Sequence, residues 1–408
     1  MNFNDTPEEA KYRAAVKAWL AKNGADFLAD RPGAPPMYSP EYLAEARRWQ
    51  ALKAEAGYAC ILAPQPWGPG GTPMERAIYL EEEAAFGIDF LTLTGIGEGI
   101  AVLTLLAVAS DELKARMVPS TMRGERFWSQ LFSEPSGGSD VAAARTRAVR
   151  SGDKWIVNGQ KIWSTSARYT DNALLLVRTD PDVPKHMGLT MFVCDMKDPA
   201  IEVRPIHQMN DEFEFNEVFF NDLVLTDADV IGEVGGGWRA AIAALMLERV
   251  AVGGATGPQY EQVMELARQV QGPSGSLLAE PTVRAKLADL YISLEGLRLT
   301  RLRALTALSR GSVPGPENSI GKLIAGQAGQ DLANFAIEIE DQFGVINDPA
   351  VARMGAVFQK KLLSSPSIRI AGGTDEIMKN IIAERVLNLP GDIRADKDVP
   401  FRDLPQGR

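Results

Sequence analysis

Residues 128–140 read Trp-Ser-Gln-Leu-Phe-Ser-Glu-Pro-Ser-Gly-Gly-Ser-Asp, and the organisation of the chain changes around them. The stretch opens as an apolar, strand-like run and then breaks into Glu134-Pro135 and the small residues 136–139. A turn of this composition offers backbone donors and hydroxyl groups to a ligand. Helical apolar spacing precedes the stretch, and a β-rich segment follows it. We therefore expect the functional site at this junction.

The chain before the junction has the apolar spacing of helices. Thr6, Pro7 and Glu9 carry the signature of a capping box with proline in the first turn. Further helices are expected over 41–56, 73–86 and 99–123. These elements predict an N-terminal all-α domain over residues 1–125.

The chain after the junction has the pattern of strands. Lys154–Val157 and Gln160–Ser164 are expected to pair as a hairpin, because Asn158-Gly159 tolerates the positive φ of a type I′ turn. Further strands are expected over 172–179, 188–195, 201–205 and 213–225. We predict a middle antiparallel β domain over residues 126–235.

Helical spacing returns after Gly235-Gly236-Gly237. Helices are expected over 238–253, 256–271, 281–310, 321–343, 354–368 and 375–387. Leucines on one face of the longest of them are typical of a bundle. The sequence thus predicts a C-terminal helical bundle over 236–390 and an extended, charged tail over 391–408. The fold class is a multi-domain α+β protein.

Composition limits the possible functions. With 408 residues and 45% hydrophobic content the chain can bury a large core. The longest apolar run, Ala101–Ala109, is too short to span a bilayer, and the N-terminus has no signal-peptide pattern. A cytoplasmic protein without membrane insertion is expected. The net charge of −10 argues against nucleic acid as a partner.

Several kinds of site are disfavoured by the residues that the chain contains. The two cysteines, Cys60 and Cys194, are far apart, and neither histidine, His186 or His207, has a metal-ligand neighbour, so no metal site is expected. The chain also has no Gly-x-Ser-x-Gly elbow, no phosphate loop and no good dinucleotide fingerprint.

Glu248 is an acid in an almost wholly apolar helix, 240–252. Desolvation would raise its pKa toward the range in which a carboxylate can accept a proton from a weak carbon acid. The residues alone leave two interpretations open, a general base and a buried structural ion pair. Adjacent Arg249 is no obvious partner, because neighbouring residues point to different sides of a helix.

The order helix, sheet, helix and a set of motifs resemble the flavin-dependent acyl-CoA dehydrogenase family over nearly the whole chain. The motifs are Gln130-Leu131-Phe132-Ser133-Glu134-Pro135, Gly138-Ser139-Asp140, Asn158-Gly159-Gln160-Lys161-Ile162-Trp163 and Gly373-Thr374. The resemblance implies a C-terminal four-helix bundle and FAD held between it and the β domain. It also implies removal of an α-proton and a β-hydride from an acyl-CoA, with electron-transferring flavoprotein as electron acceptor.

The resemblance assigns roles to individual residues. Trp163 is expected to pack on the flavin ring, Thr165 to approach the hydride-accepting N5, and Ser139 to lie near the CoA chain. With them, the expected cofactor-binding residues are Gln130, Leu131, Phe132, Ser133, Ser164, Arg268, Thr374 and Glu376, and the other expected substrate-binding residues are Arg249 and Gly373.

The chain departs from the usual family pattern at two places. Where most members have their catalytic Glu, this chain has Gly372, and Glu248-Arg249 matches the minority that carry the base on the first helix of the bundle. We therefore predict Glu248 as the base, with the Gly372 N–H assisting at the thioester carbonyl. The segments that usually reach the adenine half of FAD match poorly here, at Arg268–Gly272 and Asp341–Gly344.

The second departure leaves the assembly open. The chain can form a homodimer or homotetramer, or a heterotetramer in which a related subunit supplies the adenine site. A catalytically silent subunit of such a hetero-oligomer and an O₂-using oxidase or monooxygenase on the same fold are the alternative functions. The length, branching and ring content of the acyl group are not specified by the sequence.

Overall fold

The computed structural model describes residues 5–30, 33, 35–252, 260–273, 275–309, 315–391, 393 and 396–405, without the side chains of 247–252, 308 and 309. Its described residues pack into two compact units. The first comprises those within 1–208, 213–247 and 393–408, and the second those within 209–212 and 248–392. Each unit is described by itself.

The first unit begins with the predicted helices. Thr6 caps the first of them, and its side chain accepts from Glu9 N while the Glu9 carboxylate accepts from Thr6 N, so the capping box is confirmed. Trp49, Phe27, Tyr79 and Leu20 form the centre of an aromatic core between these helices. The helices are α1 (Pro7–Trp19), continued by η1 (Leu20–Gly24) and α2 (Ala25–Ala29), α3 (Pro40–Glu55), α4 (Pro73–Phe86), α5 (Leu91–Ile96), η2 (Gly97–Ala101), α6 (Val102–Val108) and α7 (Asp111–Met122).

The run α5–η2–α6 is continuous over Leu91–Val108, which by length and composition is enough to cross a membrane. The expectation based on Ala101–Ala109 alone underestimated this helix. Ile100, Val102 and Leu105 are buried against the sheet, in the same core as Trp128. The helix is therefore a core element of the folded unit. It ends at Ala109, and Ser110 caps a separate helix, α7, where the sequence had predicted one helix over 99–123.

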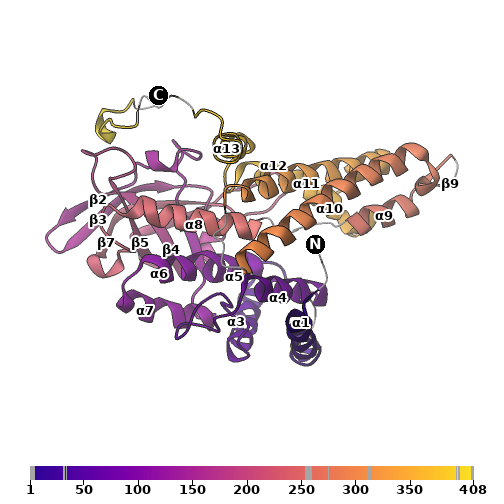
Figure 1. Cartoon of the computed structure of the whole chain (residues 1–408), viewed down its shortest axis with the longest axis horizontal. Coiled ribbons are helices and arrows are strands. Elements are labelled where there is room, and N and C mark those ends of the chain that lie inside the picture. Colours follow the sequence, from indigo (N-terminus) through magenta and orange to yellow (C-terminus); the bar gives the residue numbers. More distant parts are fainter. Residues whose placement is uncertain are drawn as a thin grey trace. The chain divides into compact units, whose positions relative to one another are not determined.

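The middle region is a seven-stranded sheet in the order β1-β4-β2-β3-β7-β6, with β5 on β4. The sheet is mixed, which corrects the prediction of an antiparallel sheet. Strand β1 pairs in parallel with β4, with Trp128 opposite Asn172. The long stretch of chain between the two strands makes this parallel pairing possible. Figure 1 shows α6 and α7 beside this sheet. The strands are β1 (Trp128–Leu131), β2 (Arg147–Ser151), β3 (Lys154–Lys161), β4 (Asn172–Arg178), β5 (Leu189–Asp195), β6 (Ile201–Pro205) and β7 (Asn216–Thr226).

The predicted hairpin turn at Asn158-Gly159 is wrong. Strand β3 continues through both residues, and its hairpin is with β2, joined by the two residues between Ser151 and Lys154. Asn158 instead faces a bulge in β7, where Asp222 has φ +57 and exchanges two hydrogen bonds with the Asn158 side chain at 2.8 and 3.0 Å. The tolerance of Asn-Gly for unusual backbone angles is used for this bulge and not for a turn.

Helix α8 (Gly237–Val252) leads from the first unit into the second. Within the second unit the longer helices α9 to α12 pack around a core that includes Leu266, Leu290, Leu332 and Phe358. The predicted helical region is thus confirmed among the described residues, where helix ends are shifted by a few residues; the expected ends at 253, 256–259 and 310 lie outside the described residues. Its helices are α9 (Tyr260–Gln269), α10 (Pro281–Ser309), α11 (Asn318–Glu340), α12 (Val357–Ile370) and α13 (Asp375–Ile381), with η9 (Ile382–Val386).

The sequence suggested an extended tail, but segment 396–405 is not simply extended. It forms a short helical turn, η10 (Phe401–Asp403), and joins the first unit, where Pro400 bridges to Pro184. Figure 1 shows this last part of the chain, in yellow, beside the loops of the β domain.

Candidate functional site

The structure brings two predicted cofactor segments together at the end of β1. Ile162 N donates to Ser133 O at 3.0 Å, and Ser129 Oγ donates to Thr165 O at 3.0 Å. Leu131 and Phe132 are buried in the cores on the two faces of the sheet, while Gln130 and Ser133 stay partly accessible. Residues 130–133 and 162–165 therefore form one continuous wall.

Trp163 is the outstanding side chain of this wall. It is 55% exposed although it is a large aromatic, and its φ of +60° is costly for a residue with a Cβ. Phe215 lies edge-on to it, with ring centroids 5.9 Å apart. A strained, exposed indole held in place suits a flat aromatic ligand that would cover it.

Buried polar atoms next to Trp163 also fit a cofactor. Ser164 and Asn216 exchange backbone hydrogen bonds at 3.0 and 3.1 Å. Yet Ser164 Oγ and Asn216 Oδ1 are buried and have no hydrogen-bond partner among the described residues. An unpaired buried polar atom costs about 1–3 kcal/mol, which a ligand that pairs with it would recover. The residues present thus fit a flavin ring.

Tyr38 holds the same segment from the N-terminal helical region. Its hydroxyl lies 2.7 Å from Ser166 Oγ, and its ring stacks on Tyr169 at 4.4 Å with an interplanar angle of 3°. Both Tyr38, at φ +64°, and Ser166, at φ +54°, are in the left-handed region. Tyr38 was not predicted as a site residue, since no local sequence pattern links it to a segment so far along the chain.

Glu134 belongs to a turn, as predicted, because it exchanges two backbone hydrogen bonds with Gly137. Its side chain, however, forms a buried ion pair with Lys161 at 2.7 Å and accepts from Arg145 N and Thr146 N at 2.6 and 2.9 Å. Burial favours a higher pKa for Glu134, but Lys161 and the two N–H donors outweigh it and lower the pKa. Glu134 is a fixed anion that braces the turn, which makes it a poor base.

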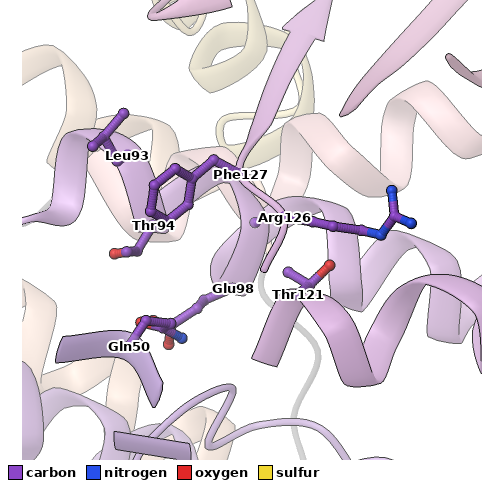
Figure 2. A pocket seen from close by; sticks show the side chains of 8 residues that line it. Gln50, Leu93, Thr94, Glu98, Thr121, Arg126 and Phe127 are labelled. Atoms are coloured by element: carbon purple, nitrogen blue, oxygen red, sulfur yellow. The ribbon is translucent and has the colours of Figure 1, made fainter. Parts of the chain in front are cut away.

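A small recess lies between α3, α5, η2 and α7 (Figure 2), and Glu98 is the acid among the described residues that line it. The Glu98 carboxylate accepts from Lys53 Nζ at 2.8 Å and from Cys60 N at 3.1 Å. Burial opposes ionisation of Glu98, but Lys53 outweighs it and lowers its pKa. This acid is therefore also committed to a structural pair.

The predicted thioester-side residues form a turn in the second unit, between α12 and α13. Gly372 and Gly373 have φ of +64° and +96°, and a Cβ on Gly373 would lie 2.5 Å from Met378 Cε. Gly373 O accepts from buried Lys322 Nζ at 2.5 Å, and the Thr374 side chain caps α13. Glu376 is exposed in the first turn of that helix.

The remaining predicted site residues lie in the second unit, on helices α8 and α9. Glu248 and Arg249 are on α8, and their side chains lie outside the part that the structure describes. Arg268 is exposed near the end of α9, paired with Glu265 three residues earlier.

Comparison with known proteins gives the family. Models of the acyl-CoA dehydrogenase N-terminal, middle and C-terminal domains match residues 6–125, 129–223 and 235–387. Acyl-CoA dehydrogenase FadE34 of Mycobacterium tuberculosis is 38% identical over 93% of this chain and 51% of its own length. Acyl-CoA dehydrogenase IpdE1 of the same organism is 34% identical over 93% of this chain and 97% of its own.

The chain thus spans about half the length of FadE34 and nearly all of IpdE1. Among solved structures, the Tcur3481–Tcur3483 steroid ACAD matches with a TM-score of 0.81 and 22% identity, over 96% of this chain and 100% of that one, a likeness of fold. The matched domains and the identity to IpdE1 over nearly its full length lead to one conclusion: the chain belongs to the acyl-CoA dehydrogenase family, whose members typically bind FAD.

Proposed function

We propose that this chain catalyses the FAD-dependent α,β-dehydrogenation of an acyl-CoA thioester to a trans-2-enoyl-CoA, with Glu248 taking the α-proton. The observation that carries the flavin part is Trp163, strained and 55% exposed within the wall of residues 130–133 and 162–165. Family membership and the placement of Glu248 in the apolar helix α8 support the catalytic part.

In this mechanism bound FAD would supply the acceptor for the β-hydride. Trp163 would exclude water from the ring, and Thr165 would face the edge that accepts the hydride. Glu248 would remove the α-proton, since an apolar helix raises the basicity of its carboxylate. The Gly372 N–H would stabilise the charge that develops on the thioester oxygen, which makes the α-proton more acidic.

A second candidate is a catalytically silent subunit of a hetero-oligomer. It is favoured by Arg268, the expected adenine-side residue, whose guanidinium is already paired with Glu265. The two-component steroid ACAD Tcur3481–Tcur3483 also has this fold. We propose that a related subunit can complete the site for the adenine half of FAD. We also propose that the acyl group of the substrate is bulky, as in steroid side chains.

The test begins with the flavin content of the purified protein, with and without any subunit that copurifies. Anaerobic titration with straight-chain, branched, dicarboxylic and steroid side-chain acyl-CoA thioesters should then bleach the flavin and yield an enoyl product lighter by two hydrogen atoms. Reoxidation by electron-transferring flavoprotein or by O₂ separates a dehydrogenase from an oxidase. Bound flavin that no thioester in the panel bleaches would favour the silent subunit.

A further inference from the structure

The segment 396–405 packs around the buried side chain of Arg178, the last residue of β4. Arg178 is 3% exposed, and its guanidinium donates to three backbone oxygens, Ala142 O at 2.5 Å, Ala144 O at 3.3 Å and Lys185 O at 2.6 Å. No carboxylate lies within ion-pair distance of it in the described part of the chain. Burial lowers the pKa of Arg178 to about 10, as expected of a desolvated cation.

Phe401 covers this cation. Its ring centroid lies 3.8 Å from Arg178 Cζ, the distance of a close cation–π contact. The backbone of the segment is held on the loop before β5, because Phe401 N donates to Val183 O at 2.9 Å and Arg402 N to Pro181 O at 3.0 Å. The ring is therefore placed by its own backbone as well as by the cation.

Lys185 makes a second connection to the same region. Its Nζ lies 2.6 Å from Asp140 Oδ2 and 2.5 Å from Asp396 Oδ2, and its side chain is only 12% exposed. One lysine thus joins the end of the 136–140 turn to the C-terminal segment. Arg178 joins Ala142 and Ala144, just after that turn, to the same segment.

The turn itself has few contacts of its own. Residues 135, 136, 138, 139 and 140 are exposed. Among the described residues 134–144, the backbone hydrogen bonds are the pair between Glu134 and Gly137 and those from Ala143 N to Asp140 O and from Ala144 N to Val141 O. Its position depends on what holds its two ends. The Glu134–Lys161 pair fixes the first end, and Arg178 with Lys185 fixes the second.

We infer that segment 396–405 positions the 136–140 turn and the residues that follow it, 141–144, for the CoA part of the substrate, with Phe401 and Asp396 acting as positioning residues through Arg178 and Lys185. The inference rests on the proposed function, because it takes an acyl-CoA as substrate and Ser139 beside the CoA chain, as the family resemblance implies. It adds to that function a part of the chain more than two hundred residues away from the turn.

The test compares Phe401→Ala with two controls. Phe401→Tyr keeps the aromatic face, and Arg402→Ala changes the next residue of the segment and removes its exposed ion pair with Asp182. In Phe401→Ala, hydrogen exchange of the 136–146 amides should become faster. The KM for the acyl-CoA should rise roughly tenfold with kcat nearly unchanged, the expected worth of a desolvated cation–π contact. Flavin content should stay at the wild-type level, and Asp396→Asn should shift exchange and KM in the same direction.

Phe401→Tyr should restore both readouts, and Arg402→Ala should leave both unchanged. Unaltered exchange of 136–146 in Phe401→Ala would overturn the inference, as would an equal change in Arg402→Ala. Because hydrogen exchange needs no substrate, it reports on the inference even if no acyl-CoA is turned over, whereas absent turnover in the wild type counts against the proposed function alone.

Discussion

The Glu134–Lys161 pair is the most consequential buried charge pair near the predicted site. Lys161 is 0% exposed and donates to Glu134 and to Phe132 O, so removal of either partner leaves a charge without compensation. Lys161→Met and Glu134→Gln should each lower the free energy of unfolding by about 3–5 kcal/mol. Chemical denaturation measures this, and the double variant should recover much of the loss. Glu202→Gln, in an exposed pair with Arg204, is the control and should change little.

The same pair predicts how stability depends on pH. The folded-state pKa of Glu134 is lowered, so its contribution is fully present above the unfolded pKa of about 4.3 and is lost as pH falls through the folded value. Acid titration of stability should therefore show a loss at low pH that is smaller in the double variant than in the wild type. Equal acid sensitivity of the two proteins would contradict the lowered pKa.

Tyr38 provides a prediction about the flavin-side segment. Tyr38→Phe removes only the hydroxyl that lies 2.7 Å from Ser166 Oγ and keeps the stacked ring. The loss of one hydrogen bond, worth about 0.5–1.5 kcal/mol, should slow flavin reduction by substrate by up to roughly tenfold while flavin stays bound. Stopped-flow absorbance measures the rate, with Tyr291→Phe on the surface of α10 as control. An unchanged rate would show that Tyr38 does not position this segment.

At the residue scale, some of these features could be predicted and some could not. Trp155, Val157 and Lys161 lie on one face of β3, because side chains alternate with a period of two along a strand. The burial of Lys161 could therefore have been predicted if the strand had been expected to continue through Asn158-Gly159. The partners of Tyr38 and Arg178 were not, because they lie far away along the chain.

At the element scale, the hairpin was mispredicted because Gly159 was interpreted as a turn residue. In the structure, glycine at this position allows the close approach of Thr146, and this can be tested. A Cβ on Gly159 would lie 2.7 Å from Thr146 Cα, and the φ is +147°. Thr146 N is also a donor to Glu134. Gly159→Ala should therefore push Thr146 away from β3, weaken the hydrogen bond from Thr146 N to Glu134, and destabilise the protein by roughly 1–3 kcal/mol, measured by thermal unfolding.

A matched glycine substitution is available in α10. Gly296 is inside a helix with nothing within 4 Å of an added Cβ, so Gly296→Ala should leave stability unchanged or raise it by about 0.5–1 kcal/mol. If both substitutions had the same effect, close approach of Thr146 would not be the reason for glycine at 159.

Helices were predicted better than strands, for local reasons. Capping residues such as Thr6, Thr72 and Thr374 mark where helices begin, and these signals are read within a few residues. Strand β2 has two arginines in five residues and no apolar alternation, and it was not predicted. The parallel pairing of β1 with β4 depends on contacts between distant segments, which a local pattern does not contain.

At the scale of the whole molecule, function depends on how parts distant in sequence are combined. Within the first unit, segment 396–405 returns to the β domain, which the sequence suggested only as an extended tail. The proposed base is on α8, the helix that leads into the second unit, and the Gly372 turn belongs to that second unit. The motif resemblance predicted these roles together, although no single spacing could.

The central claim, that this chain is the catalytic flavin subunit with Glu248 as its base, is tested most directly by the anaerobic reductive half-reaction of Glu248→Gln. With the acyl-CoA that bleaches the wild-type flavin fastest, the variant should bind flavin normally and reduce it at least about 10²–10⁴-fold more slowly. The control Glu261→Gln, an exposed acid on α9, should behave as wild type. A Glu248→Gln protein that reduces its flavin at nearly the wild-type rate would contradict the account.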